Sequence, residues 1–277
     1  ERDVHATTFG EVALTGATGR HAWVAGGAIQ YEGYAARDVE GFDFGHLTSS
    51  VFAQDEVGFA EWLTVALSGR LDHHSEYGPF LNPRLSVLLR PGAYWTVRGS
   101  LGTGYFAPTP FTEETEVVGL SAVEPLDGLA AERAVSASLD IGRTVGPVEL
   151  NATLFGSEVR EPLMVRTTGA GTLELFNAES AVRTHGTDLL GRLHREPFHV
   201  TATYTYTRST EPDPESGARR AVPLTPRHAA GLVGMWEAEG EGRVGVEVYH
   251  TGRQALEDNP YRETSRPYVI LGFLVER

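Results

Sequence analysis

The segment His199–Arg208, with the sequence HVTATYTYTR, alternates strictly between two kinds of side chain. Val200, Ala202, Tyr204 and Tyr206 fall on one face, and threonines occupy the positions between them. Successive side chains of a β-strand point to opposite faces, so such a strand separates an apolar phase from a polar one. The segment therefore predicts a strand that is apolar on one side and polar on the other.

The same period of two recurs along the chain. It is clear in WLTVALSGRLDHH from Trp62 and in RAVSASLDIG from Arg133. Soluble strands most often have about five or six residues, whereas a tilted strand needs about nine to eleven to cross a bilayer. The alternating segments add up to about thirteen strands, with no long amphipathic helix. A soluble sandwich or propeller is the alternative, but no propeller repeat of about 40 to 50 residues is visible.

The connections between these segments alternate in length. Tight joints such as TGATGRH and RPGAYW are followed by long polar ones such as AARDVEGFDFG and STEPDPESGARRAVPLTP, with HSEYGPF a modest member of the long class. All tight turns then lie at one end of the sheet, as in outer-membrane barrels. The sequence thus predicts an all-β fold, an antiparallel transmembrane β-barrel.

Aromatic residues near the two sets of connections are expected to form two interfacial girdles. The girdle at the tight turns comprises Trp62, Trp95, Phe198 and Trp236, and the girdle at the long connections comprises Tyr77, Phe80, Tyr105, Phe106 and Tyr268.

The direction of the strands indicates a partial barrel. If the connections alternate, the first and thirteenth strands point the same way, and closure would need a parallel seam that antiparallel membrane barrels lack. An open edge within a bilayer leaves backbone groups unsatisfied, at several kcal/mol each. We therefore expect missing strands on both flanks. The opening ERDVHATTFG, which has neither an initiator Met nor an apolar leader, agrees with an interior segment.

Charge and composition argue against several functions. The chain has 37 acidic residues against 23 basic ones, a formal net charge of -14, so nucleic acid is not an expected partner. It has 0 cysteines, which removes disulfides, thiolate metal sites and cysteine nucleophiles. No apolar run is long enough for a transmembrane helix, which needs about 20 residues.

A glycine cluster at Gly99, Gly102 and Gly104 raises the possibility of a phosphate-binding loop. Such a loop lies between a strand and a helix, but YFAPTP follows, and Pro108 and Pro110 prevent a helix there. We instead expect a strand in which Gly102 and Gly104 leave space on the polar face. No cofactor is expected.

The ten histidines include no HExxH motif. His73 and His74 are adjacent on a predicted strand and point to opposite faces, so no metal site is expected. No G-x-S-x-G motif is present, and no catalytic residues are assigned. Asp72 and His74 share one face, as the acid and histidine of outer-membrane barrel proteases do, which leaves a hydrolase as a minor alternative.

Cations and aromatic residues in the long connections are the candidate ligand contacts. ESGARRAVP and HTGRQALEDNPYR place guanidinium groups and an aromatic ring in outer loops of an acidic protein, which suits an anionic or chelated ligand. Solvated loop charge is the competing interpretation, and the acids of TEETE could attract cations instead. The candidate contacts are Tyr77, Phe111, Arg219, Arg220, Arg253 and Tyr261.

Several longer passages occur in a characteristic order. LNPRLSVLLRPGAYWTVRGSLGTGYFAPTPFTEE, from Leu81, precedes VEPLDGLAAERAVSASLDIG and VELNATLFGSEVREPL, and FNAESAVRTHGTDL, VPLTPRHAAGL and HTGRQALEDNPYR come later. From Phe52 onward this succession resembles the barrel of TonB-dependent outer-membrane receptors. The chain departs from the family pattern in having Ala131 before Glu132 and no arginine between Phe106 and Ala107.

The resemblance implies a parent barrel of about 22 strands, plugged by an N-terminal domain. It also implies binding and TonB-driven import of a ferric siderophore, cobalamin or another scarce ligand in the outer membrane of a Gram-negative bacterium, without enzymatic chemistry. The implied partners are outer-membrane lipid, a small chelated or anionic ligand, and TonB through a plug missing from residues 1–277. Early and last strands are expected to be missing too, which would leave the segment unable to transport alone. A passive porin-like channel is the main alternative.

Overall fold

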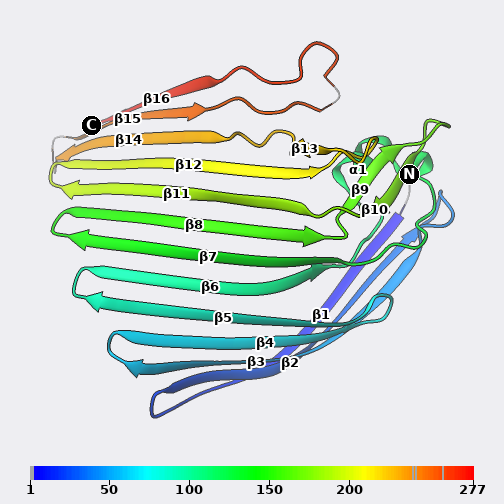
Figure 1. Cartoon of the computed structure of the whole chain (residues 1–277), viewed down its shortest axis with the longest axis horizontal. Coiled ribbons are helices and arrows are strands. Elements are labelled where there is room, and N and C mark those ends of the chain that lie inside the picture. The colour runs from blue at the N-terminus through cyan, green and yellow to red at the C-terminus, as the bar shows by residue number, and fades with distance from the viewer. Residues whose placement is uncertain (1–2, 239, 241, 258) are drawn as a thin grey trace.

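The computed structural model describes residues 3–238, 240, 242–257 and 259–277. One antiparallel sheet dominates it, and most strands pair with their neighbours in sequence (Figure 1). Along the main path the strands are β1 (Asp3–Thr18), β2 (His21–Ala36), β3 (Phe44–Ala60), β4 (Leu63–His74), β5 (Gly78–Gly92), β6 (Trp95–Phe106), β7 (Glu132–Val145), β8 (Val148–Arg160), β11 (Val182–Arg195), β12 (Phe198–Pro212), β14 (His228–Ala238), β15 (Gly242–Thr251) and β16 (Tyr268–Glu276).

The path contains thirteen strands, which confirms the number expected from the sequence. All its pairings are antiparallel, so β1 and β16 run in the same direction. Within the described residues β1 pairs only with β2, and β16 pairs only with β15. The all-β fold is confirmed, and the sheet is open at both edges.

The alternation of connections is also confirmed. Figure 1 shows the tight turns gathered at one end of the curved sheet and the long connections at the other. The long connections contain α1 (Glu113–Val118), a short 3₁₀ turn (Leu120–Ala122), the hairpin of β9 (Leu163–Thr167) and β10 (Leu173–Asn177), and β13 (Arg219–Ala221). Neither described helix has the length and hydropathy needed to cross a membrane.

The two faces of the sheet differ as the period of two predicts. On β8, Leu150 and Leu154 are each 52% exposed, and Asn151 and Thr153 between them donate hydrogen bonds to Asp140 of β7, at 2.8 and 2.9 Å. We call the first side the apolar face and the second the polar face.

The segment His199–Arg208 lies in β12 and follows this division. Its Tyr204 is on the apolar face, and Thr205 donates a 2.7 Å hydrogen bond to Asp188 on the polar face.

The aromatic girdle at the tight turns is largely as expected, because Trp62, Trp95 and Phe198 are exposed there. The second girdle is partly wrong. Phe80 is only 2% exposed, and its ring stacks on that of Tyr105 with centroids 3.8 Å apart. Pairing between β5 and β6 stops at Arg84 and Gly102, so the strands separate beyond that point and the two rings pack together there.

The glycine segment lies in β6, as expected, and no phosphate loop forms. A Cβ on Gly102 would lie 3.3 Å from Cγ of Arg84. The absence of a side chain therefore leaves space on the polar face that the side chain of Arg84 partly occupies. Helix α1 starts beyond both prolines of YFAPTP, where Thr112 caps its first turn.

The buried hydrophobic cluster lies among the long connections. Tyr34 at the end of β2 packs with Phe42, Leu120, Val123 and Leu175, which come from three different connections. Tyr34 belongs to the polar face, so the connections fold over that face at its loop end. A sequence of long polar loops did not indicate that they would hold most of the buried apolar residues that the structure describes.

Candidate ligand site at the loop end of the sheet

A row of rings crosses the first three strands on the polar face. His5, Tyr34 and Phe44 are direct cross-strand neighbours on β1, β2 and β3. Phe111, from the connection after β6, enters this row. Its ring centroid lies 4.7 Å from that of Tyr34 in an edge-on arrangement and 5.7 Å from that of His5 in a stacked one. Such aromatic pairs are favourable beyond their area of contact. Phe111 therefore anchors its connection to the inner wall.

The row continues toward β4. His46 stacks on Phe44 with ring centroids 4.7 Å apart and meets His74 edge-on at 4.8 Å, and His74 lies 5.1 Å from Tyr77. The whole set, called the aromatic strip below, is His5, Tyr34, Phe44, His46, His74, Tyr77 and Phe111.

Tyr77 lies in the turn between β4 and β5, where backbone contacts position it. Its hydroxyl donates to the carbonyl oxygen of Pro108 at 3.0 Å, and the amides of Glu76 and Tyr77 donate to Nδ1 of His74 at 3.2 and 3.3 Å. Burial raises the pKa of Tyr77, and the charge of Glu76 raises it further. The hydroxyl therefore remains a proton donor at neutral pH.

A cavity of about 480 Å³ adjoins the strip, within the range of about 300–1,000 Å³ typical of small-molecule sites. It combines aromatic, imidazole and apolar walls with two carboxylates. Its lining includes Phe42, Asp43, His46, Glu76, Tyr77 and Leu129.

The arginines of β13 have structural partners. Arg220 forms ion pairs with Glu211 at 2.8 Å, with Asp213 at 3.2 Å and with Glu257, which ties β13 to the connection before β16. Hydrogen bonds from Ser216 lower the pKa of Asp213, so this carboxylate stays charged. Three acids thus surround the one guanidinium, and an anionic ligand would have to displace them.

The remaining candidates are more open. Arg219 donates to the hydroxyl of Thr210 at 3.1 Å and to the carbonyl of Ala181. Tyr261 is 88% exposed, and the guanidinium of Arg253 is exposed without a side-chain partner in the described part of the chain. The structure brings only Tyr77 and Phe111 of the six candidates into one strip.

Sequence reasoning missed His5, Tyr34, Phe44 and His46. A signal was present, because each is an aromatic residue at a polar-face position close to the loop end of its strand. Large rings on the polar side of an amphipathic strand need a partner on that side. The partner, Phe111, is remote in sequence and only the fold reveals it.

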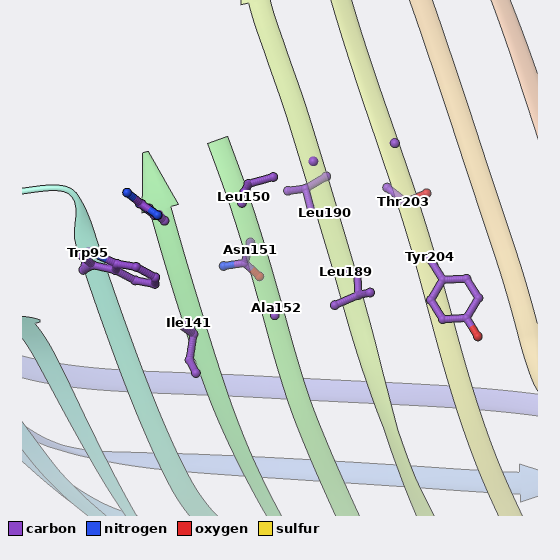
Figure 2. A pocket seen from close by; sticks show the side chains of 12 residues that line it. Trp95, Ile141, Leu150, Asn151, Ala152, Leu189, Leu190, Thr203 and Tyr204 are labelled. Atoms are coloured by element: carbon purple, nitrogen blue, oxygen red, sulfur yellow. The ribbon is translucent and has the colours of Figure 1, made fainter. Parts of the chain in front are cut away.

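A second hollow lies on the apolar face. Figure 2 shows Trp95, Ile141, Leu150, Leu189 and Tyr204 around it, on five neighbouring strands. Its volume is about 520 Å³, but the labelled side chains are mostly apolar and no group of charges converges on it. This hollow has the character of the outer wall rather than of a polar ligand site.

Asp72 and His74, on which the hydrolase alternative rests, each have other partners in the described part of the chain. Asp72 accepts hydrogen bonds from the hydroxyl of Ser50 at 2.5 Å and from Nε of Arg70 at 2.7 Å. Nδ1 of His74 accepts from the backbone amides described above, so this nitrogen does not link Ser50 to Asp72. Over the described ranges, no group of three or more His, Asp or Glu side chains could hold a metal ion.

Comparison with known proteins agrees with the sheet and its strand order. Residues 5–275 match the family model described as "TonB dependent receptor-like, beta-barrel". An iron-regulated outer membrane virulence protein of Vibrio cholerae is 25% identical over 205 residues, which are 67% of this chain and 31% of that protein.

Solved structures share the fold. The ferric enterobactin receptor PfeA of Pseudomonas aeruginosa aligns with a TM-score of 0.80 at 17% identity, covering 98% of this chain and 46% of the receptor. The siderophore receptor PirA of Acinetobacter baumannii gives 0.74 at 15% identity, with 98% and 48% covered. The FrpB iron transporter of Neisseria meningitidis gives 0.79 at 11%, with 97% and 48% covered.

The chain thus spans less than half the length of these relatives, between 31% and 48%. Its match over nearly all its own residues, together with the amphipathic antiparallel sheet and the alternating connections, places it in one family. The chain belongs to the TonB-dependent receptors and forms part of their β-barrel.

Proposed function

We propose that the full-length protein captures a ferric siderophore at its outer mouth and imports it with energy supplied through TonB. The observation that carries this proposal is the aromatic strip with its adjoining cavity, at the loop end of the polar face. The chain lies in the outer membrane of a Gram-negative bacterium, the location of its family. The relatives named above for iron regulation, siderophores or iron transport support iron as the cargo.

The parent architecture follows from the open edges. Residues 1–277 would form the middle and later part of a barrel of about 22 strands, with further strands pairing to β1 and β16. An N-terminal plug would fill the space beside the polar face and contact TonB. The flanking strands would close the barrel and the plug would make the contact with TonB, neither of which a single open sheet can provide.

The chemistry of the strip suits a chelator with flat or apolar groups. Phe44 and Tyr77 present rings to the cavity, and Leu129 adds an apolar wall. Phe111 packs behind this lining, with its ring centroid 6.4 Å from that of Phe44. Arg253 offers a guanidinium that no described acid neutralises, which suits an anionic group on the ligand. Cobalamin is the second ligand class that the family suggests.

A passive channel is the alternative function. The packing of Phe111 on Tyr34 favours a receptor, because the connections are folded onto the inner wall by buried contacts.

Uptake of labelled ferric siderophores and labelled cobalamin by cells carrying the full-length gene, with and without TonB, tests the proposal. We expect TonB-dependent uptake of a siderophore. Phe111→Ala should weaken its binding about tenfold, and the control Phe59→Ala, which removes an exposed ring at the tight-turn end, should leave binding unchanged. Uptake that does not depend on TonB would favour the channel. TonB-dependent uptake of cobalamin but of no siderophore would assign cobalamin as the ligand instead.

A further inference from the structure

A hollow rich in arginine lies at the loop end of β7, β8 and β11. It has a volume of about 720 Å³ and contains four guanidinium groups and three carboxylates. We call it the arginine hollow, and its charged residues are Arg133, Arg160, Arg183, Arg219, Glu158, Glu161 and Glu179.

The register places the strand residues of the hollow on the apolar face. Leu154, Glu158 and Arg160 are separated by even numbers of residues on β8, so they point to the same side. Arg183 of β11 is the direct neighbour of Glu158, and Arg133 of β7 is the direct neighbour of Arg160. The hollow is therefore on the outer wall, opposite to the aromatic strip.

Its height along the wall can be counted from β8. This strand starts at Val148 beside a tight turn and carries Leu150 and Leu154 on the apolar face. A tilted strand crosses the hydrocarbon core in about nine to eleven residues, so the core ends close to Glu158. Arg160 and its neighbours then lie at the level of the outer-leaflet headgroups.

The charges in the hollow are incompletely compensated. Glu158 accepts from Nε of Arg160 and from Nε of Arg183, both at 2.9 Å, which leaves the terminal nitrogens of both guanidiniums available. Arg133 lies 5.0 Å from the ring centroid of Phe80. Within the described residues neither Arg133 nor Arg219 forms an ion pair.

The arrangement carries an electrostatic cost without an anion. Arg133 and Arg160 are like charges directly opposite each other on neighbouring strands, and such pairs are destabilising. Glu161 and Glu179 offset part of this charge, but the hollow keeps a net positive charge in a chain whose formal net charge is -14. A bound anion would relieve the repulsion.

We propose that the arginine hollow binds the phosphate group of a phosphorylated lipid in the outer leaflet. Guanidinium groups bind phosphate through paired, charge-assisted hydrogen bonds, and basic groups at a membrane surface attract anionic headgroups. The hollow opens on the side where lipid lies and away from the polar face, so it is placed for a headgroup rather than for the imported ligand. Lipid binding here would anchor the loop end of the wall in the leaflet.

The test uses the full-length protein purified in detergent and titrated with diphosphorylated lipid A, the phosphorylated glycolipid of the Gram-negative outer leaflet. We expect saturable binding, at least tenfold weaker in Arg160→Gln/Arg183→Gln. The matched control is Arg192→Gln/Arg243→Gln, which removes the same charge and two ion pairs on the polar face and should bind like the parent. Equal binding by the two double variants would overturn the proposal.

Two further arms separate lipid from a free anion and binding from folding. Dephosphorylated lipid A should bind at least tenfold more weakly than the diphosphorylated form, and equal binding of both forms would overturn the role of phosphate. Inorganic phosphate that displaced the lipid at equimolar concentration would assign the hollow to a free anion instead. Glu158→Gln removes the competing carboxylate and should strengthen binding severalfold, and an unchanged or weaker affinity would contradict the proposal.

Discussion

Phe111 should control how firmly the connection after β6 is held against the inner wall. Phe111→Ala removes a half-buried ring whose centroid lies 4.7 Å from that of Tyr34 and 5.7 Å from that of His5. Truncation of a fully buried phenylalanine costs about 3–5 kcal/mol. Because Phe111 is not fully buried, we expect a value below this range, roughly 2 kcal/mol, for the docking of the connection. At about 1.4 kcal/mol per factor of ten, this is roughly a 30-fold shift toward the undocked state.

Hydrogen exchange followed by mass spectrometry on the full-length protein measures this equilibrium. Helix α1 reports on it through the amides of Glu116 and Gly119, which donate to carbonyls at 3.0 and 2.8 Å. These amides should exchange roughly 30-fold faster in Phe111→Ala, while those of β12 stay unchanged. Phe111→Leu keeps part of the apolar volume, so its exchange rate at α1 should lie between those of the parent and of Phe111→Ala. Unchanged exchange at α1 in Phe111→Ala would refute the anchoring role of the ring.

Three further changes test other contacts. Thr115→Val removes a buried hydroxyl that donates to the carbonyl of Pro110 at 2.7 Å and completes the cap of α1, so the helix should lose about 1–2 kcal/mol and exchange faster; equal exchange would contradict this. Gly186→Ala would place a Cβ 2.5 Å from the ring of Phe155 and should lower the thermal unfolding temperature through a strain of about 1–3 kcal/mol, whereas Gly104→Ala, which meets open space, should not. The raised pKa of Tyr77 means that its contribution to docking is complete below the ordinary tyrosine pKa and is lost as pH rises through the raised value. Exchange at α1 should therefore accelerate in that alkaline window in the parent more than in Tyr77→Phe, and an equal response would show that Tyr77 is not the titrating group.

The wall of the protein was predictable because its rules are local. The alternation in β12 assigns Tyr204 and Thr205 to opposite faces whatever the rest of the chain does. Phe80 shows where local rules stop, because its position near a long connection suggested a girdle, but separation of β5 from β6 lets its ring pack on Tyr105. A local pattern carries no information about where two strands part.

The candidate site was predictable only in part for the same reason. Tyr77 and Phe111 were recognisable as aromatic residues in outer connections, and both enter the strip. Arg220 was recognisable as a loop cation, but its partner Glu257 comes from another connection. Whether a loop arginine is free or already paired depends on a neighbour that the surrounding sequence does not name.

Taken alone, the sequence determined the all-β class, the two unlike faces and the gathering of long connections at one end, because a period of two and an alternation of turn lengths are properties of neighbouring residues. Tertiary structure decided that His5 and Phe111 meet, that the buried cluster lies among the connections, and that Arg133, Arg160 and Arg183 share one hollow. These contacts depend on the register and curvature summed over many strands, which bring together residues far apart in the chain.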